Sequence, residues 1–333
     1  IVFGTRPEII KLYPIIKEMK NAYLAWTGQH DELATQMLEE FKIKPDESLN
    51  VMTNNQSLTS LTVKLHQKIS EVLERIKPEM VIIQGDTTSA MVAALEAYYH
   101  KIPVAHVEAG LRTGNIYAPF PEEINRHIIT QIAEINFTPT RSATINVLHE
   151  SMGFTYQTGN TAIDTLKEFS KKVKARKKKK ILLTIHRREN IDKIPDILEQ
   201  IKIFVAVNPN WEIIIPVHPN PNVKKKFYEV VLPKQIKLVE PLSYTEMTKE
   251  MKESAFIITD SGGIQEEAPS LNRFVLVVRD KTERKEGIGK CAKLVRPENL
   301  LREMYDLVYS QPRISHNPYG DGHAGKRIAK FLE

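Results

Sequence analysis

Short apolar runs alternate with longer segments of helical periodicity along the whole chain. Residues 1–3 predict a first strand, and the polar turn that follows leads into a helix extending to about residue 20. Pro7 suits the first position of that helix, whereas Pro14 is expected to kink it. Further strands are predicted at residues 80–84, 103–107 and 136–138, with a helix at 89–100. Such alternation of strand and helix is typical of a parallel, doubly wound sheet.

The alternation starts again after residue 180. Strands are predicted at residues 181–184, 212–217, 236–239, 256–259 and 274–278, and a helix at 194–207. Because 333 residues are many for one core, we predict two Rossmann-like α/β domains in tandem. The N-terminal domain is placed at 1–170, a linker at 171–180, the C-terminal domain at 181–312 and a C-terminal helix at 313–333. Ligands of such sheets bind beyond the carboxyl ends of the strands, and two such domains make a natural cleft.

The positive net charge is concentrated in one place. The whole chain carries +6, and residues 171–180 alone contribute eight positive charges, which leaves −2 for the remainder. We interpret this lysine-rich run as a solvated linker between the domains. RNA binding through the run is the alternative, but no aromatic residues or glycines interleave there as a platform for bases. We therefore expect no nucleic-acid partner.

The remaining composition is that of an ordinary globular protein. The single cysteine, Cys291, excludes an internal disulfide framework and indicates a reducing, cytoplasmic location. With no second thiol, a structural zinc site is not expected. No run of about 18 or more apolar residues occurs and no signal peptide is visible, so no membrane partner is expected. The chain begins inside a predicted strand, and a few preceding residues are expected to be missing.

The stretch Thr-Asp-Ser-Gly-Gly-Ile-Gln-Glu-Glu at 259–267 is the most informative part of the sequence. It lies between a β-branched apolar run and an apolar-periodic run, which predicts a strand, a tight turn and a helix start. Ser261, Gly262 and Gly263 are then expected at the helix N-terminus, where free N–H groups favour an anion such as phosphate. Glu267 is expected one turn into the helix, where it can accept hydrogen bonds from a diol such as ribose. These features favour a nucleotide-sugar site; the alternative is a glycine turn that binds nothing.

Cations and carboxylates lie at predicted strand ends in the N-terminal half. Arg6 and Lys11 follow the first strand and can reach a phosphate, with a solvated surface turn as the alternative. Asp86 and Glu108 end consecutive strands, which places both in one crevice if those strands are neighbours. Two nearby carboxylates raise the pKa of at least one of them, as general acid–base catalysis at neutral pH requires. Alternatively, Asp86 caps the next helix and Glu108 is a helix partner.

Other candidate residues also lie after a strand or at a helix start. Glu122 follows a proline-stiffened loop near a helix start, where the helix dipole alone also favours an acid. His186, followed by two arginines, is suited to contact a diphosphate. Arg112, His218 and Arg284 lie in polar stretches after other strands, and we count them with the substrate-binding residues.

Three common site motifs are missing from the sequence. There is no Gly-x-x-x-x-Gly-Lys-Ser/Thr phosphate-binding loop, and no Gly-x-Gly-x-x-Gly follows the first strand. No Gly-x-Ser-x-Gly nucleophile elbow occurs either. The chain therefore lacks the usual motif for binding a nicotinamide dinucleotide.

Taken together, the polar stretches resemble those of the non-hydrolysing UDP-N-acetylglucosamine 2-epimerase family. They keep the order of that family and span almost the whole chain, which makes the resemblance specific. The matching stretches are residues 4–11, 27–30, 85–88, 106–113, 121–126, 186–190, 218–223, 260–270, 279–283 and 317–324.

This resemblance implies a fold and a reaction. The fold is the GT-B architecture, two Rossmann-like domains with the active site in the cleft between them. A C-terminal helix, from about residue 320, is implied to cross back to the N-terminal domain. The reaction interconverts UDP-GlcNAc and UDP-ManNAc by eliminating UDP to 2-acetamidoglucal and adding it back with the opposite configuration at C2. The family forms homodimers and needs no metal or nicotinamide cofactor.

The resemblance also assigns roles to residues. The nucleotide-binding positions correspond to Arg6, His186, Ser261, Gly262, Gly263, Glu267 and Arg284. The acid–base and structural carboxylates correspond to Asp86, Glu108 and Glu122. We expect the first two near C2, and the sequence leaves open which carboxylate removes the C2 proton. The predicted catalytic group is Asp86, Glu108, Glu122 and His186.

The sequence departs from the bacterial pattern of this family at two positions. Gln84 stands where histidine is usual, and Lys64 aligns with an arginine of a second, activating UDP-GlcNAc site. Lysine does not replace arginine in bidentate phosphate contacts, although Gln29 and His30 of that site are retained. Allosteric activation is therefore left open.

Three other functions stay open at this point. A UDP-sugar glycosyltransferase on the same fold would need an acceptor pocket, and three carboxylates exceed what simple transfer requires. A hydrolysing epimerase would release UDP and ManNAc because water intercepts the intermediate. A nucleotide-sugar sensor would bind its ligand without turnover.

Overall fold

The protein consists of two compact units. The structure is a computed structural model that describes residues 1–28, 32–51, 53 and 56–333. Unit 1 contains residues 1–165 and 320–333, and unit 2 contains residues 166–319. The predicted domain boundaries at residues 170, 180 and 312 stay a prediction. Each unit is described by itself.

Unit 1 is built on parallel strands. They are β1 (Val2–Phe3), β2 (Ala25–Trp26), β3 (Glu47–Ser48), β4 (Val81–Gln84), β5 (Val104–Val107), β6 (Ile135–Thr138) and β7 (Phe154–Gln157). Hydrogen bonds join β1, β2 and β3 in that order, and join β4 to β7 in sequence order. Because β1 also lies beside β4, the spatial order is β3-β2-β1-β4-β5-β6-β7. The strand order therefore reverses between β1 and β4.

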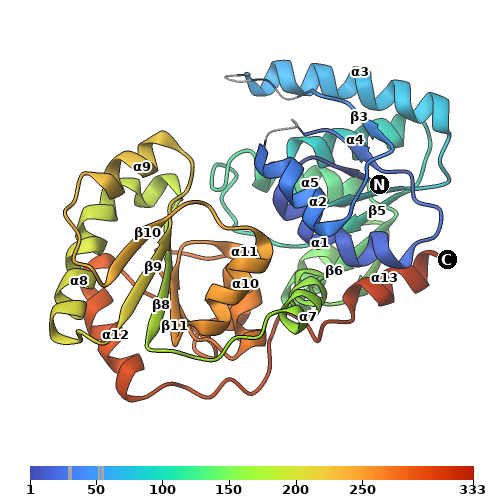
Figure 1. Ribbon diagram of the computed structural model, residues 1–333. Helices are drawn as coiled ribbons and strands as arrows, with labels where there is room; N and C mark the ends of the chain where they lie inside the picture. The colour runs from blue at the N-terminus through green and yellow to red at the C-terminus, as the bar shows by residue number, and fades with distance from the viewer. Residues whose placement is uncertain (29–31, 52, 54–55) are drawn as a thin grey trace. The chain divides into compact units, whose positions relative to one another are not determined.

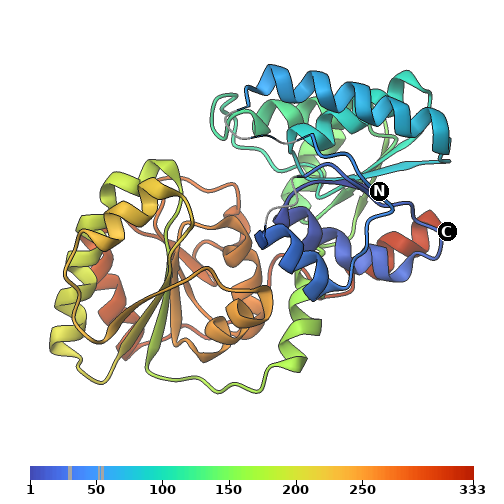
Figure 2. The same cartoon turned by 45° about the horizontal axis from the view of Figure 1, so that its top comes forward.

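Helices cover this sheet on both faces. They are α1 (Arg6–Glu18), α2 (Glu32–Phe41), α3 (Leu58–Ile76), α4 (Thr88–Tyr99), α5 (Glu122–Ile132), α6 (Arg141–Glu150) and α13 (Ala324–Leu332). Leu65, Val92 and Ile129 from α3, α4 and α5 are buried in one core. The C-terminal helix α13 lies beside α1 (Figures 1 and 2), and Gly325 allows the close approach to Pro14. Helix α1 continues past Pro14, and the kink expected there stays a prediction.

Unit 2 repeats the same plan. Its strands are β8 (Lys180–Thr184), β9 (Glu212–Pro216), β10 (Ile236–Val239), β11 (Phe256–Thr259), β12 (Val275–Val277) and β13 (Ala292–Leu294). They pair in parallel in the order β10-β9-β8-β11-β12-β13. Counted within the unit, this is the 3-2-1-4-5-6 order of doubly wound nucleotide-binding sheets, with the reversal between β8 and β11. The predicted Rossmann-like parallel sheets are confirmed.

Side chains of alternate strand residues in unit 2 pack against helices on opposite faces. The helices are α7 (Ala162–Lys172), which begins in unit 1, α8 (Ile194–Val207), α9 (Pro221–Tyr228), α10 (Tyr244–Glu253), α11 (Gly262–Glu267) and α12 (Leu300–Tyr309). Ile181 and Leu183 of β8 pack in a core with residues of α8, α9 and α12, whereas Leu182 packs with residues of α10 and α11. Both faces of the sheet are therefore buried, which explains the continuous apolar strand sequences.

The lysine-rich run differs from its prediction at one end. Lys180 begins β8 and is buried, with its ammonium 2.5 Å from a carboxylate oxygen of Glu250 and 2.9 Å from one of Glu253. The interpretation of residues 171–180 as wholly solvated is therefore wrong for Lys180. The two carboxylates compensate the charge that burial removes from water.

Within the described part of the chain, no helix combines the length and the apolar character that a membrane span requires. The same residues contain no cluster of three or more histidine, cysteine or acidic side chains placed to hold a metal ion.

Candidate active site

Polar side chains gather where the strand order of each sheet reverses. In unit 1 they follow β1 and β4, and in unit 2 they follow β8 and β11. The chain leaves two such strands toward opposite faces of the sheet, so their loops diverge and leave a crevice at the carboxyl edge. Of the predicted residues, Arg6, Lys11 and Asp86 follow β1 or β4, and His186 and residues 261–267 follow β8 or β11. The other predicted residues follow neighbouring strands or begin a helix.

Glu8 joins the two loops of unit 1. It lies in the first turn of α1, is 1% exposed, and accepts hydrogen bonds from the Gly4 amide at 3.0 Å and the Thr5 hydroxyl at 2.7 Å. Its other oxygen accepts from the Thr87 hydroxyl at 2.9 Å. Burial raises the pKa of Glu8, and these hydrogen bonds act in the opposite direction. The β1–α1 turn that carries Arg6 is thereby held against the loop after β4.

Glu108 lies directly after β5 in a strained backbone conformation, with φ at +66°. Its carboxylate accepts hydrogen bonds from Lys11 Nζ at 2.6 and 2.5 Å, and from Gln84 Nε2 at 2.5 Å. Lys11 was predicted to bind phosphate; in this structure its charge lies against a predicted catalytic carboxylate. The positive φ turns Glu108 out of the strand direction and toward the end of β4.

Asp86 is held by helix α5. Arg126 Nε donates to the Asp86 carboxylate at 2.7 Å, and Asn125 Nδ2 donates to its backbone carbonyl at 2.8 Å. The cap of helix α4 is Thr87, whose hydroxyl accepts from the Ala90 amide at 3.0 Å. The alternative that Asp86 serves as the helix cap is therefore wrong.

His106 fixes the turn that precedes Asp86. It is fully buried in β5, and its Nε2 donates to the Gly85 carbonyl at 2.7 Å. Gly85 has φ at +72°, which glycine adopts without strain. Burial lowers the pKa of His106 to about 4, so the imidazole is neutral at physiological pH.

Helix α5 supplies two neighbouring carboxylates with different surroundings. Glu123 is fully buried and accepts from the Thr113 and Gly114 amides and from Arg126. Glu122 begins the helix, and its Oε2 is buried with no hydrogen-bond partner among the described residues. Glu122 lies three and four residues before Asn125 and Arg126, so it shares the helix face that contacts Asp86.

Arg112 is engaged elsewhere in unit 1. Its guanidinium donates to both carboxylate oxygens of Glu150, at 2.7 Å for the shortest bond, and to the Thr130 hydroxyl at 2.9 Å. The side chain therefore joins α5 to α6. Substrate binding by Arg112 stays a prediction.

Asp260 joins the two central loops of unit 2. It is 0% exposed and accepts from the His186 and Arg187 amides at 3.1 and 2.9 Å and from Asn190 Nδ2 at 3.1 Å. His186 Nδ1 also lies 3.1 Å from its carboxylate. Burial alone would raise the pKa of Asp260, but His186 and the donated hydrogen bonds hold it below the usual value.

The His186 ring is oriented on two sides. Asp260 faces its Nδ1, and the His218 ring stacks on it with centroids 5.4 Å apart and planes 15° apart. His218 Nδ1 accepts from the Asn220 amide at 3.2 Å, which orients the second ring as well. The structure thus brings together the two histidines that the sequence placed after different strands.

Arg284 packs directly on Gly262. Its Nε donates to Glu266 at 2.8 Å, its Nη1 contacts Glu283, and Arg279 donates to the other oxygen of Glu283 at 2.9 Å. Burial tends to raise the pKa of Glu283, but the two guanidiniums lower it well below its usual range. A Cβ on Gly262 would lie 2.5 Å from Arg284 Cζ. The space that Gly262 leaves is therefore filled by the guanidinium.

The space beside Gly263 is not filled by any other residue that the structure describes. A Cβ on Gly263 would meet only Ser261 Oγ, at 4.0 Å, and the Ser261 side chain makes no capping hydrogen bond. The first amides of α11 have no acceptor within the helix. Glu267 accepts from the Tyr244 hydroxyl at 2.9 Å, which orients its carboxylate. Ser261, Gly262, Gly263 and Glu267 stay the predicted nucleotide-binding part of this helix.

The C-terminal segment fastens these elements. The Tyr319 hydroxyl donates to the Arg284 carbonyl at 2.8 Å and accepts from the Gly287 amide at 3.0 Å. Asn317 Nδ2 donates to the Glu266 carbonyl at 2.8 Å. Residues just before the unit boundary therefore position the Arg284 loop and helix α11.

Several supporting residues were not selected from the sequence. They are Glu8, His106, Glu123, Asn125, Arg126, Asn190, Asp260, Glu266, Glu283 and Tyr319. Most lie inside the polar stretches that follow strands, which the sequence identifies as candidate site segments. The partner of each side chain lies far away in sequence, and no local pattern identifies it.

The proposed allosteric residues are only partly described. Gln29 and His30 lie outside the described residues. Lys64 is half-buried in α3. Their role stays a prediction.

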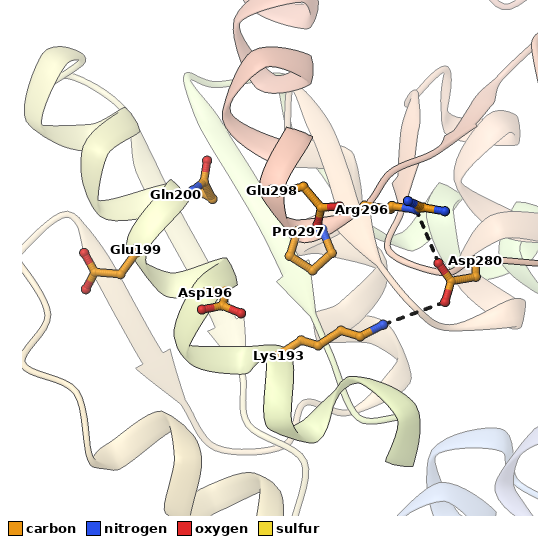
Figure 3. Close-up of a pocket in the computed structure, with 8 residues that line it drawn as sticks. All are labelled: Lys193, Asp196, Glu199, Gln200, Asp280, Arg296, Pro297 and Glu298. Atoms are coloured by element: carbon orange, nitrogen blue, oxygen red, sulfur yellow. Dashed lines mark ion pairs between the residues drawn. The ribbon is translucent and has the colours of Figure 1, made fainter.

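A cavity of about 540 Å³ lies elsewhere in unit 2 (Figure 3). It is lined by Lys193, Asp196, Glu199, Gln200, Asp280, Arg296, Pro297 and Glu298. Lys193 and Arg296 point toward Asp280, at 3.9 and 3.6 Å. None of the predicted site residues lines it.

Known proteins share this sequence and structure over nearly their whole length. Residues 16–333 match the family model described as UDP-N-acetylglucosamine 2-epimerase. The UDP-N-acetylglucosamine 2-epimerase of Campylobacter jejuni is 44% identical, over 100% of this chain and 96% of its own. That of Bacillus subtilis is 41% identical, over 99% and 93%. The crystal structure of UDP-GlcNAc 2-epimerase from Neisseria meningitidis bound to UDP-GlcNAc matches with a TM-score of 0.90 at 38% identity, over 99% and 98%.

The depressed pKa of His106 predicts an acid-dependent loss of stability. The unfolded histidine takes up a proton near pH 6.5 and the folded one near pH 4, so stability falls as pH decreases through this interval. At about 1.4 kcal/mol per pH unit, the loss amounts to roughly 3 kcal/mol. Denaturant unfolding of His106→Gln at several pH values should show that the unfolding free energy no longer falls by this amount as pH decreases. The same substitution at exposed His316 is the control and should leave the slope unchanged; equal slopes for both variants would refute the assignment.

The packing of Arg284 on Gly262 predicts different outcomes for two adjacent glycines. Gly262→Ala collides with a guanidinium held by Glu266 and Glu283, and should cost about 1–3 kcal/mol of unfolding free energy. Gly263→Ala is the matched control; it meets no atom closer than 4.0 Å and should be neutral or gain up to about 1 kcal/mol. Denaturant unfolding without ligand measures both. Equal stabilities would contradict the packing argument.

Proposed function

Because the chain belongs to the UDP-N-acetylglucosamine 2-epimerase family, we propose that it interconverts UDP-GlcNAc and UDP-ManNAc. The observation that carries this proposal is the chemistry of the two reversal points. Carboxylates fixed by hydrogen bonds lie where the strand order of unit 1 reverses. A histidine and arginines lie where the strand order of unit 2 reverses. Inverting C2 needs proton transfer, and the departing UDP needs positive charge.

Proton transfer at C2 is the task of unit 1 in this proposal. The C2 proton is not activated by a neighbouring carbonyl, so the reaction proceeds by elimination of UDP across C1 and C2 to 2-acetamidoglucal. Addition of UDP with the proton delivered to the opposite face of C2 completes the inversion. Asp86, Glu108 and Glu122 are the acid–base and structural carboxylates in this proposal. Other residues hold Asp86 and Glu108 by hydrogen bonds, and Glu122 begins helix α5. Groups held in place lose little entropy when the transition state forms.

Stabilisation of the leaving diphosphate is the task of His186 and Arg284 of unit 2 in this proposal, and the resemblance assigns Arg6 to the nucleotide as well. Negative charge on the β-phosphate grows as the C1–O bond breaks, so donors aimed there act more strongly on the transition state than on the substrate. His186 is oriented by Asp260 and His218, and Arg284 by Glu266 and Gly262. Ser261, Gly262, Gly263 and Glu267 are proposed to bind the phosphates and the ribose diol.

The remaining expectations about partners belong to this proposal as well. We propose a homodimer, which sedimentation equilibrium tests directly, and no nucleic-acid partner. The cytoplasmic location indicated by the single cysteine stays a prediction, as does activation by a second UDP-GlcNAc.

Isotope exchange tests the reaction itself. Incubation with UDP-GlcNAc in D2O should give UDP-ManNAc with deuterium at C2, because the proton removed from C2 is replaced from solvent. Proton NMR follows the loss of the C2 signal. Release of free UDP with ManNAc would instead establish the hydrolysing reaction, and an unchanged spectrum at high substrate concentration would contradict the epimerase proposal.

The Asp86 carboxylate should be needed for turnover and not for binding UDP. In Asp86→Asn the amide cannot transfer a proton as the carboxylate does, so kcat should fall about 10²- to 10⁴-fold. The affinity for UDP, measured by calorimetry, should change little. Glu74→Gln, an exposed carboxylate on α3, is the control and should keep wild-type turnover. Near wild-type kcat in Asp86→Asn would remove Asp86 from the catalytic group.

A further inference from the structure

Gln84 occupies an unusual place for an amide side chain. It is the last residue of β4, 3% exposed, at the carboxyl edge of the sheet where the strand order reverses. Its Nε2 donates to Glu108 Oε2 at 2.5 Å. Strands β4 and β5 pair in register with Gln84 opposite Val107, so the residue after Val107 is the one that Gln84 reaches.

Two donors of different kinds hold the Glu108 carboxylate. Lys11, from helix α1, brings a positive charge to both carboxylate oxygens, and Gln84 adds a neutral donor to one of them. The ammonium can rotate and move on a flexible stem, whereas the amide extends from a buried strand. Gln84 therefore fixes the position of Oε2 from a buried strand, and the Lys11 charge offsets the burial of the carboxylate.

An amide suits a group that changes its charge during a reaction. The Gln84 N–H donor is present at every pH and carries no charge, so it stays in place whether Glu108 is ionised or holds a proton. In the acid–base role that the proposed function gives to Glu108, the Oε2 atom bound by Gln84 still accepts a hydrogen bond through a lone pair when the carboxyl group holds a proton. The geometry of the carboxylate is then the same before and after the transfer.

We propose that Gln84 is a positioning residue for the reaction, one that holds the Glu108 carboxylate in one orientation throughout proton transfer. This inference rests on the proposed function, in which Glu108 belongs to the acid–base group. Gln84 itself exchanges no proton, and its role is carried entirely by the hydrogen bond to Oε2.

Two substitutions separate this role from a merely structural one. Gln84→Glu keeps the shape of the side chain; its protonated form donates to Glu108 as the amide does, and its ionised form repels Glu108. We expect kcat of this variant to fall at least about tenfold as pH rises over a range where the wild-type value is level. Gln84→Met keeps the length without a donor, and its kcat should fall about tenfold to a hundredfold at every pH, with KM little changed.

Deuterium incorporation at C2 of UDP-GlcNAc, followed by NMR between about pH 5 and 9, gives kcat and KM; this range lies above the usual pKa of a glutamate side chain and leaves room for a raised one. Gln67→Glu, the same substitution at an exposed position of α3, is the control and should match the wild type. Thermal unfolding of each variant is measured under the same conditions.

Each outcome decides the proposal. Wild-type kcat with a level pH profile in Gln84→Glu, or wild-type kcat in Gln84→Met, would overturn it. A loss of activity that follows a fall in melting temperature, with no pH dependence in Gln84→Glu, would also overturn it, because a structural role predicts that result. Absence of deuterium incorporation in the wild-type protein refutes the proposed function instead, so the two failures are distinguishable.

Discussion

The reversal of strand order in a parallel sheet is the constraint on which this structure depends. At the reversal, two neighbouring strands send their chains to opposite faces, and the loops between strand and helix lose contact with each other. Both units bridge this gap with a buried carboxylate. In unit 1, Glu8 in the first turn of α1 accepts a hydrogen bond from Thr87, which follows β4. In unit 2, Asp260 after the fourth strand accepts from the His186 and Arg187 amides after the first.

A buried carboxylate is costly unless its oxygens are satisfied, and both bridges satisfy theirs with several donors. Glu8 accepts three hydrogen bonds from the two loops, and Asp260 accepts backbone amides together with Asn190 and the His186 ring. Truncating either residue would leave these donors buried and unpaired, a penalty larger than the loss of an average hydrogen bond. The loops on both sides of each reversal are therefore anchored by an interaction that forms only when the fold is complete.

The two reversal points then differ in charge. Unit 1 holds its candidate carboxylates through basic or amide partners, as in the contacts of Glu108 with Lys11 and of Asp86 with Arg126. Unit 2 holds its candidate histidine and arginine through acidic partners, as in the contacts of His186 with Asp260 and of Arg284 with Glu266. In the proposed function, the carboxylates serve proton transfer, and the histidine and arginines serve the leaving group. One sheet plan, used twice, carries both kinds of group.

The sequence by itself determined the alternation of strands and helices, the polar stretches after the strands and, through ten of those stretches, the family. These are local properties, because strand periodicity, glycine turns and motif order are set by residues close together in the chain. Strands such as β2, β3 and β7 were not predicted, since two of them are only two residues long and the third is largely exposed. Only the tertiary structure decided that Thr87 caps α4, that Arg126 holds Asp86, that Arg112 pairs with Glu150, that Arg284 fills the space beside Gly262 and that Lys180 is buried. The Thr87 cap is local, but Asp86 was an equally local alternative. Each of the other contacts joins residues distant in sequence. Packing, and no pattern along the chain, determines which of the many charged side chains become partners.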